Sequence, residues 1–209
     1  MINVSQTKVR IATVVGLPGV GKSTVLSIAV KELEKRGYHV ELVNFGDFMF
    51  EAMKRAGLVS SRDEIRRYRF REQKRYQIQA AKDIVKHFSE VASKSDKPVI
   101  GLVDTHAVIK TVAGFWPGLP KYVIEELNPD VIIVIEATPE EIVSRASKDR
   151  TRYRADYLDI NLIRELLNLN RVYAISSATH VGASVVFVEN REGKPEEAAK
   201  KVVEVLMNI

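Results

Sequence analysis

The chain has 209 residues, of which 45% are hydrophobic, and it carries a formal net charge of +5. This length is enough for one sizeable core, so we expect a single compact unit over residues 1–209. The absence of cysteine excludes disulfides, thiolate metal sites and thiol redox catalysis. No apolar run is long enough to span a bilayer and the start lacks a signal-peptide pattern, so we expect a cytoplasmic protein without membrane contact. The positive charge suits phosphate-bearing partners, whether nucleotides or nucleic acid.

Apolar runs alternate with helical patterns along the chain. Residues 9–15 are rich in β-branched side chains and end at Gly16, which predicts a buried strand. The apolar spacing of residues 22–36 predicts an amphipathic helix that ends at Gly37. Further strands are predicted at 39–44, 98–103, 131–135 and 184–188, and a last helix begins near Pro195. This alternation predicts an α/β fold with a five-stranded parallel doubly wound sheet.

Two segments interrupt the alternation. Residues 48–93 contain far more helix than one crossover needs, and residues 147–157 are basic and poor in apolar side chains. Insertions at the mouth of a ligand site commonly close over the ligand, so we expect both segments to be lids on one domain.

The strongest motif is a glycine loop between the first strand and the first helix. Residues 16–23 fit the pattern G-x-x-x-x-G-K-[ST], in which backbone N–H groups surround a phosphate and the helix N-terminus adds positive charge. Lys22 is then expected to neutralise the β and γ oxygens of a nucleoside triphosphate, and Ser23 to meet Mg²⁺. The alternative is a glycine turn capped by a helix.

Asp104 ends the apolar strand at 98–103, where a parallel sheet presents residues to its ligand crevice. A phosphate loop requires an acidic partner for its metal, so Asp104 is predicted to hold Mg²⁺ through water. The alternative is a helix cap or an ordinary loop acid.

Several further motifs narrow the family. The chain resembles the nucleoside monophosphate kinases, and in particular adenylate kinases of the archaeal type, over nearly its whole length. The residues that carry the resemblance are Gly16 to Thr24, Asn44-Phe45-Gly46-Asp47-Phe48-Met49, Arg62-Asp63-Glu64, Asp104-Thr105-His106-Ala107, Pro117-Gly118-Leu119-Pro120 and Asn170-Arg171.

The resemblance implies a phosphate-loop kinase sheet with a helical AMP-binding insertion at 46–93 and a short arginine-rich lid at 145–158. It implies that the ATP phosphates are bound by Gly16, Leu17, Pro18, Gly19, Val20, Gly21, Lys22, Ser23 and Thr24. Candidates for the AMP site are Asp47, Met49 and Arg66, together with His106, which follows Asp104 into the crevice. The expected catalytic side chains are Lys22, Arg145, Arg150, Arg152, Arg154 and Arg171, with the last of these on the helix after the lid.

The expected reaction is transfer of a phosphoryl group from MgATP to AMP, which gives two ADP and maintains the balance of adenine nucleotides. Such transfer needs positioning and positive charge more than a nucleophile, because its transition state is loose. Family members tend to be homotrimers, so a homo-oligomer is expected, and nucleic acid is not an expected partner.

Alternatives remain at this point. One is a kinase for another acceptor such as CMP or UMP, and another is an ATP-gated ATPase that binds nucleic acid through its basic clusters. Most of the arginines of 62–75 fit the exposed face of a long helix, with one or two of them in contact with AMP. Phe115 and Trp116 could stack on a base or pack in the protein.

Overall fold

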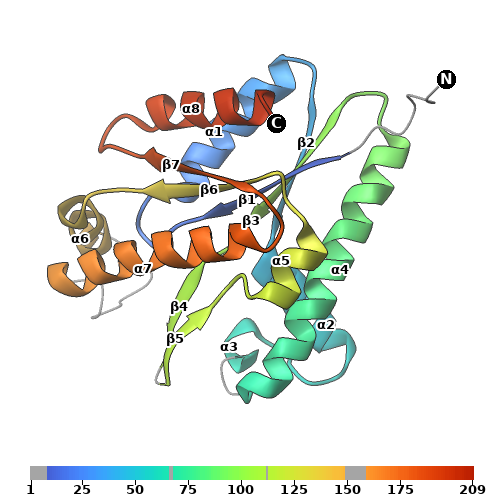
Figure 1. Cartoon of the computed structure of the whole chain (residues 1–209), viewed down its shortest axis with the longest axis horizontal. Helices are drawn as coiled ribbons and strands as arrows, with labels where there is room; N and C mark the ends of the chain where they lie inside the picture. The colour runs from blue at the N-terminus through green and yellow to red at the C-terminus, as the bar shows by residue number, and fades with distance from the viewer. Residues whose placement is uncertain (1–8, 66–67, 112, 149–158) are drawn as a thin grey trace.

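The computed structural model describes residues 9–65, 68–111, 113–148 and 159–209. Five parallel strands form one sheet in the order β2-β3-β1-β6-β7. Their bounds are Arg10–Val15 for β1, His39–Asn44 for β2, Val99–Asp104 for β3, Val131–Glu136 for β6 and Ser184–Glu189 for β7. All five predicted strands are therefore confirmed, with ends that shift by one residue at most, and so is the α/β fold (Figure 1).

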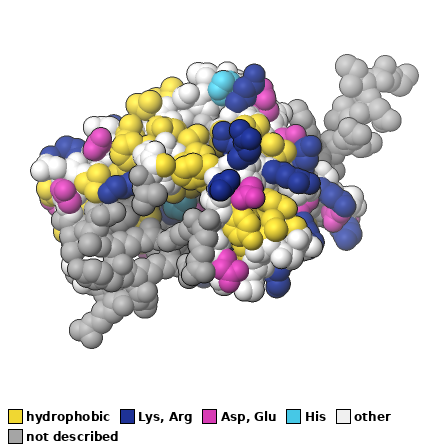
Figure 2. All heavy atoms as spheres, turned by 90° about the horizontal axis from the view of Figure 1, so that it is seen from below, with side chains coloured by type: hydrophobic (Ala, Val, Ile, Leu, Met, Phe, Trp, Pro, Cys, Tyr) yellow, Lys and Arg dark blue, Asp and Glu magenta, His cyan; other side chains and the backbone are white. Residues whose placement is uncertain are grey.

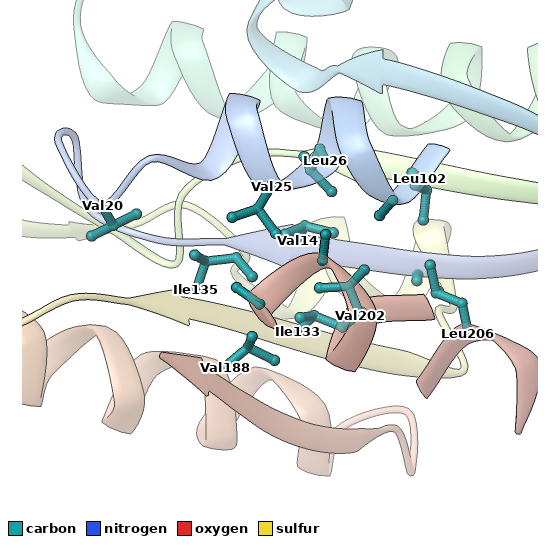
Figure 3. Packing of buried hydrophobic residues seen from close by; sticks show 14 of the residues in the cluster. Val14, Val20, Val25, Leu26, Leu102, Ile133, Ile135, Val188, Val202 and Leu206 are labelled. Atoms are coloured by element: carbon teal, nitrogen blue, oxygen red, sulfur yellow. The ribbon is translucent and has the colours of Figure 1, made fainter. Parts of the chain in front are cut away.

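Helices cover both faces of the sheet (Figure 1). One core packs against α1 (Lys22–Lys35) and α8 (Pro195–Met207), and the other against α4 (Phe70–Lys94) and α5 (Lys121–Leu127), while α7 (Ile160–Thr179) contributes residues to both cores. Strand residues alternate between these two cores: Val14 and Ile133 face α1 and α8, whereas Val15 and Ile132 face the other side. Figure 3 shows the first core, where Val25 and Leu26 of α1 and Val202 of α8 close over the strands.

The helical insertion consists of three helices. α2 (Phe45–Arg55) packs along α4, and the short α3 (Arg62–Ile65) lies between them in sequence. The expectation of one long helix for the arginines of 62–75 is wrong, because Arg69 has extended backbone and caps α4 with Glu72. Arg71, Lys74 and Arg75 are exposed on α4 as expected. Below, "the arm" means α2, α3 and α4.

A two-stranded antiparallel hairpin of β4 (Val108–Thr111) and β5 (Gly114–Pro117) was not predicted. It extends from the sheet between α7 and the start of α4 (Figure 1). The ring of Trp116 lies 4.6 Å from that of Phe70 in α4, and the Tyr173 hydroxyl of α7 donates to the Phe115 carbonyl at 3.3 Å. Trp116 thus packs against the arm, whereas Phe115 is exposed and is held through its backbone carbonyl.

The hairpin returns to the sheet through a close backbone contact. A Cβ atom at Gly118 would lie 1.8 Å from the His106 carbonyl oxygen, so only glycine fits there. The Gly118 N–H donates to Ala107 at 2.8 Å. Two motifs that the sequence analysis named, Asp104-Thr105-His106-Ala107 and Pro117-Gly118-Leu119-Pro120, are therefore in direct contact.

Helix α6 (Pro139–Lys148) leads into the segment predicted to be a lid, and it contains Arg145, the first residue of that segment. Within the described ranges, none of the helices is both long and apolar enough to cross a membrane.

Candidate nucleotide-binding site

The carboxyl ends of the parallel strands gather polar side chains around the glycine loop. Asn44 ends β2, Asp104 ends β3 and Glu136 ends β6, while Asn190 follows β7. This edge is where open α/β sheets bind ligands. Figure 2 shows the molecule from below the view of Figure 1, where Lys and Arg side chains gather on the side occupied by the arm.

The glycine loop has the shape that a phosphate requires. Gly19 and Gly21 have φ angles of 90° and 82°, and Gly21 is the N-cap of α1. No side chain caps this helix within the described residues, so its first N–H groups are left for a ligand. Leu17 and Val20 are buried and anchor the loop to the core, whereas Gly19, Ser23 and Thr24 are exposed, and Pro18 is half-buried.

Lys22 is held at the mouth of the loop by two acceptors. Its Nζ lies 2.5 Å from Oδ1 of Asp104 and donates to the Thr105 carbonyl at 2.5 Å. The two charged side chains are 11% and 21% exposed. Burial lowers the pKa of Lys22, and the Asp104 carboxylate opposes that shift. A nucleotide phosphate could take the place that Asp104 occupies beside this cation.

Ser23 and Asp104 fit a magnesium ion carried by a nucleotide. Their hydroxyl and carboxylate oxygens are the hard donors that Mg²⁺ prefers, and Lys22, which contacts Asp104, is the neighbour of Ser23. Among the described residues there is no group of three or more His, Asp or Glu that could hold a metal by itself. Nucleotide sites usually bind Mg²⁺ through one or two protein groups plus phosphate oxygens, so the residues present fit.

Arg145 braces the glycine loop from its carbonyl side. Its guanidinium donates to the carbonyls of Gly19 at 3.3 Å, Val20 at 3.0 Å and Asn190 at 3.0 Å. The Asn190 side chain donates in turn to the Val20 carbonyl at 2.7 Å. These contacts hold the carbonyl groups of Gly19 and Val20 in place. The sequence did not indicate Asn190, although its place two residues after a predicted strand was an available signal.

Glu141 fastens the start of α6 to the loop after β7. Its carboxylate accepts from the Thr138 N–H at 2.8 Å and from the Glu192 N–H at 2.6 Å, and it lies 3.9 Å from Arg145. Burial would raise the pKa of Glu141, but the two N–H donors, the Thr138 hydroxyl and Arg145 together lower it. The stem of the predicted lid is thus fixed to the glycine loop.

Arg171 lies on α7, the helix after the lid segment, as predicted. Its Nε and Nη2 contact the two oxygens of Glu136 at 2.7 and 2.5 Å, and its guanidinium lies 5.2 Å from the Phe187 ring centre. The hydrogen bond to Glu136 raises the pKa of Arg171. Half of the Arg171 side chain is exposed (52%), whereas Glu136 is buried (9%), so the guanidinium faces solvent at the end of β6. Glu136 was not predicted either.

The structure describes some, but not all, of the residues predicted to bind AMP. Asp47 is exposed in the first turn of α2 and pairs with Arg62, while Met49, two residues later, is buried. The Nδ1 atom of His106 lies 3.0 Å from the Gly16 carbonyl oxygen, so this histidine contacts the glycine loop. Four further predicted residues lie outside the described ranges: Arg66, Arg150, Arg152 and Arg154.

Comparison with known proteins agrees with this geometry. A family described as "AAA domain" matches residues 15–164, a range that begins just before the glycine loop. Solved structures with the same fold include TT1252 from Thermus thermophilus, with a TM-score of 0.56 and 18% identity over 96% of this chain and 98% of that one. Shikimate kinase from Acinetobacter baumannii has a TM-score of 0.51 and 15% identity over 97% and 95%. At these identities the likeness concerns the fold alone.

Curated relatives are much closer in sequence. The adenylate kinase of Saccharolobus solfataricus is 46% identical over 95% of this chain and 100% of its own length. The adenylate kinase of Methanopyrus kandleri is 45% identical over 93% of this chain and 96% of its own length. The adenylate kinase of Methanocaldococcus jannaschii is 42% identical over 95% of this chain and 99% of its own length. Identity at this level along both whole chains, together with a complete phosphate loop on the matching fold, establishes that the chain belongs to the adenylate kinase family.

Proposed function

We propose that this chain catalyses the reversible transfer of a phosphoryl group from MgATP to AMP, which gives two ADP and maintains the balance of adenine nucleotides. The observation that carries the proposal is the identity of 42–46% with curated adenylate kinases along nearly the whole chain. The phosphate loop with its buried Lys22 accounts for the donor, and the relatives' name supplies the acceptor.

In the donor half, residues Gly16 to Thr24 bind the ATP phosphates. Lys22 exchanges the Asp104 carboxylate for the β and γ oxygens, so its buried charge stays neutralised throughout. Ser23 and Asp104 hold the metal, with Asp104 acting through water. Bound Mg²⁺ would neutralise charge on the phosphates.

In the transfer step, arginines supply the positive charge. Arg150, Arg152 and Arg154 belong to the proposed lid at 145–158, Arg145 braces the glycine loop from the start of that segment, and Arg171 faces the end of β6 from α7. Arginines that close with a lid stabilise the oxygens of the loose transition state and exclude water that would hydrolyse ATP. No general base is required, because the phosphate of AMP is already ionised at neutral pH.

In the acceptor half, the proposed AMP-binding insertion is 46–93. Asp47, Met49 and Arg66 are its candidate contacts, and His106, which contacts the Gly16 carbonyl, is a further candidate. We further propose that the protein is cytoplasmic and forms a homotrimer, and both expectations rest on family likeness. Sedimentation equilibrium of the purified chain would test the trimer.

A coupled assay of ADP formation tests the proposal. The purified protein is incubated with MgATP alone and with AMP, CMP, UMP or GMP, and the rates are compared. We expect rapid ADP formation with AMP and little with the others. A preference for CMP or UMP would indicate a kinase for another monophosphate, and ATP loss that is indifferent to every acceptor would refute kinase activity.

A further inference from the structure

A continuous line of side-chain contacts leads from the glycine loop to the arm. Asp104 binds Lys22 through Oδ1 at 2.5 Å, and its Oδ2 accepts from the Asn44 amide nitrogen at 3.2 Å. The Asn44 amide oxygen accepts from Nη2 of Arg62 at 3.0 Å, and Arg62 also pairs with Asp47. Among the described residues, the Asn44 side chain thus contacts both Asp104 beside the glycine loop and Arg62 of the arm.

The chemistry of this position calls for an amide. Asn44 stands between a carboxylate, which needs a donor, and a guanidinium, which needs an acceptor. With its amide turned over, an oxygen would face the carboxylate and an NH₂ group would face the guanidinium, so only one orientation satisfies both neighbours. An aspartate could serve only the guanidinium, and a lysine only the carboxylate.

The backbone fixes both ends of the bridge. Asn44 and Asp104 are register partners at the ends of the parallel strands β2 and β3. Gly46 leaves room for the contact, because a Cβ there would lie 3.1 Å from Oδ1 of Asn44 and 3.2 Å from Nη2 of Arg62. The bridge is therefore built on rigid elements at the Asp104 end and on the arm at the Arg62 end.

Arg62 has capacity to bind a phosphate. About half of its side chain is exposed, and both of its contacts with described residues use Nη2. The guanidinium has five N–H donors in a planar fork, so Nε and Nη1 retain donors suited to a phosphate oxygen.

We propose that Asn44 is a positioning residue that couples acceptor binding to donor binding. It holds the Asp104 carboxylate in place when a nucleotide phosphate draws Lys22 away, and it holds Arg62 where the phosphate of the monophosphate substrate would bind. Binding on either side then favours the arrangement that the other side needs. This inference rests on the proposed function.

Four variants test the coupling: Asn44→Ala, Arg62→Ala, the double variant, and Arg55→Ala as a matched control. Arg55 is also an exposed arginine of the arm in an ion pair with an aspartate, Asp83. For each protein we would measure kcat/KM for AMP, the melting temperature, and the Kd of a non-hydrolysable ATP analogue with Mg²⁺, with and without AMP.

Contacting residues in one network are usually non-additive. We expect each single variant to lower kcat/KM for AMP about tenfold and the double variant also about tenfold, rather than about a hundredfold. AMP should tighten binding of the ATP analogue in the wild type and in Arg55→Ala, but not in the two single variants. The proposal would be overturned if the loss of kcat/KM in the double variant equalled the product of the two single losses. It would also be overturned if AMP still tightened binding of the ATP analogue in the single variants.

Two further outcomes of the experiment still allow the proposal to be tested. If Asn44→Ala does not fold, Arg62→Ala still tests the proposal through binding measured without AMP. Loss of the Arg62 contact should leave Asn44 and hence Asp104 less well held and weaken the Mg²⁺-dependent binding of the ATP analogue, whereas unchanged binding would refute the coupling. If the wild type phosphorylates no monophosphate, the proposed function fails. The bridge to Asp104 is then tested separately, since Asn44→Ala should still weaken the Mg²⁺-dependent binding of the ATP analogue at least about threefold. Unchanged binding would refute the bridge.

Discussion

Replacing Arg145 should weaken ATP binding by disordering the glycine loop. Its side chain is only 22% exposed and donates to three carbonyls, of which Val20 keeps a second donor from Asn190. Hydrogen bonds from charged donors contribute about 1.5–3 kcal/mol each; because Val20 keeps its bond from Asn190 and a freed carbonyl can bond to water, we count the net loss as about one such bond, roughly 2 kcal/mol. If that energy maintains the binding-competent loop, Arg145→Ala lowers ATP affinity about 30-fold.

Arg145→Lys separates charge from geometry. A lysine retains the charge but cannot contact several carbonyls in a planar fork, so we expect an intermediate loss of about fivefold. Calorimetry with a non-hydrolysable ATP analogue measures the affinity, and kcat is measured in parallel. Arg164→Ala is the control, because Arg164 forms an exposed ion pair with Glu140 of the same helix as Arg145. A Kd unchanged within about twofold together with a kcat reduced more than a hundredfold would refute the brace and assign Arg145 to the transferring phosphoryl group.

Three further predictions concern the surroundings of the loop. Because the folded-state pKa of Glu141 lies below its usual value, its carboxylate contributes stability above the unfolded-state pKa and loses it as pH falls through the folded-state pKa. Denaturant titrations should show Glu141→Gln destabilised by about 1 kcal/mol at pH 7, with the difference vanishing in acid; a difference that grows in acid contradicts this origin. Arg171→Leu and Glu136→Gln both remove one partly exposed ion pair, so each should cost about 1–2 kcal/mol of stability. If Arg171 also binds the transferring phosphate, only Arg171→Leu should lower kcat about a hundredfold or more, and equal kcat values for the two variants would count against that role. Asn170 is fully buried (0% exposed) and neither of its side-chain polar atoms has a partner among the described residues, so Asn170→Leu should raise stability by about 1–2 kcal/mol; a lower melting temperature would show that the amide has a partner such as a buried water.

The sequence predicted the sheet well because parallel strands buried on both faces are continuous apolar runs, as in β6. It also predicted where the glycine loop and Asp104 lie, because the loop has a specific motif and Asp104 stands at the end of a predicted strand. The same strand-end reasoning would have indicated Asn44, Glu136 and Asn190, whose roles became visible only with their partners. The hairpin β4–β5 was missed because strands of four residues leave too short a pattern.

The interactions that sequence reasoning could not predict are long-range. Arg145 contacts Val20 from 125 positions away, and nothing local in either segment indicates the contact. Arg62 was assigned to a long exposed helix because its neighbours are basic. The break between α3 and α4 instead brings it to Asp47 and Asn44. Local patterns thus identified the donor loop, whereas the side chains that support it depend on tertiary structure.

Transfer of label from ATP tests the central claim most directly. The protein is incubated with Mg²⁺, AMP and ATP labelled with ³²P in the γ-phosphate, and the products are separated at early times. Phosphoryl transfer to AMP predicts that the label appears in the β-phosphate of ADP, in an amount equal to the AMP consumed, with little inorganic phosphate. Label that appears as inorganic phosphate at the same rate with and without AMP would contradict the account.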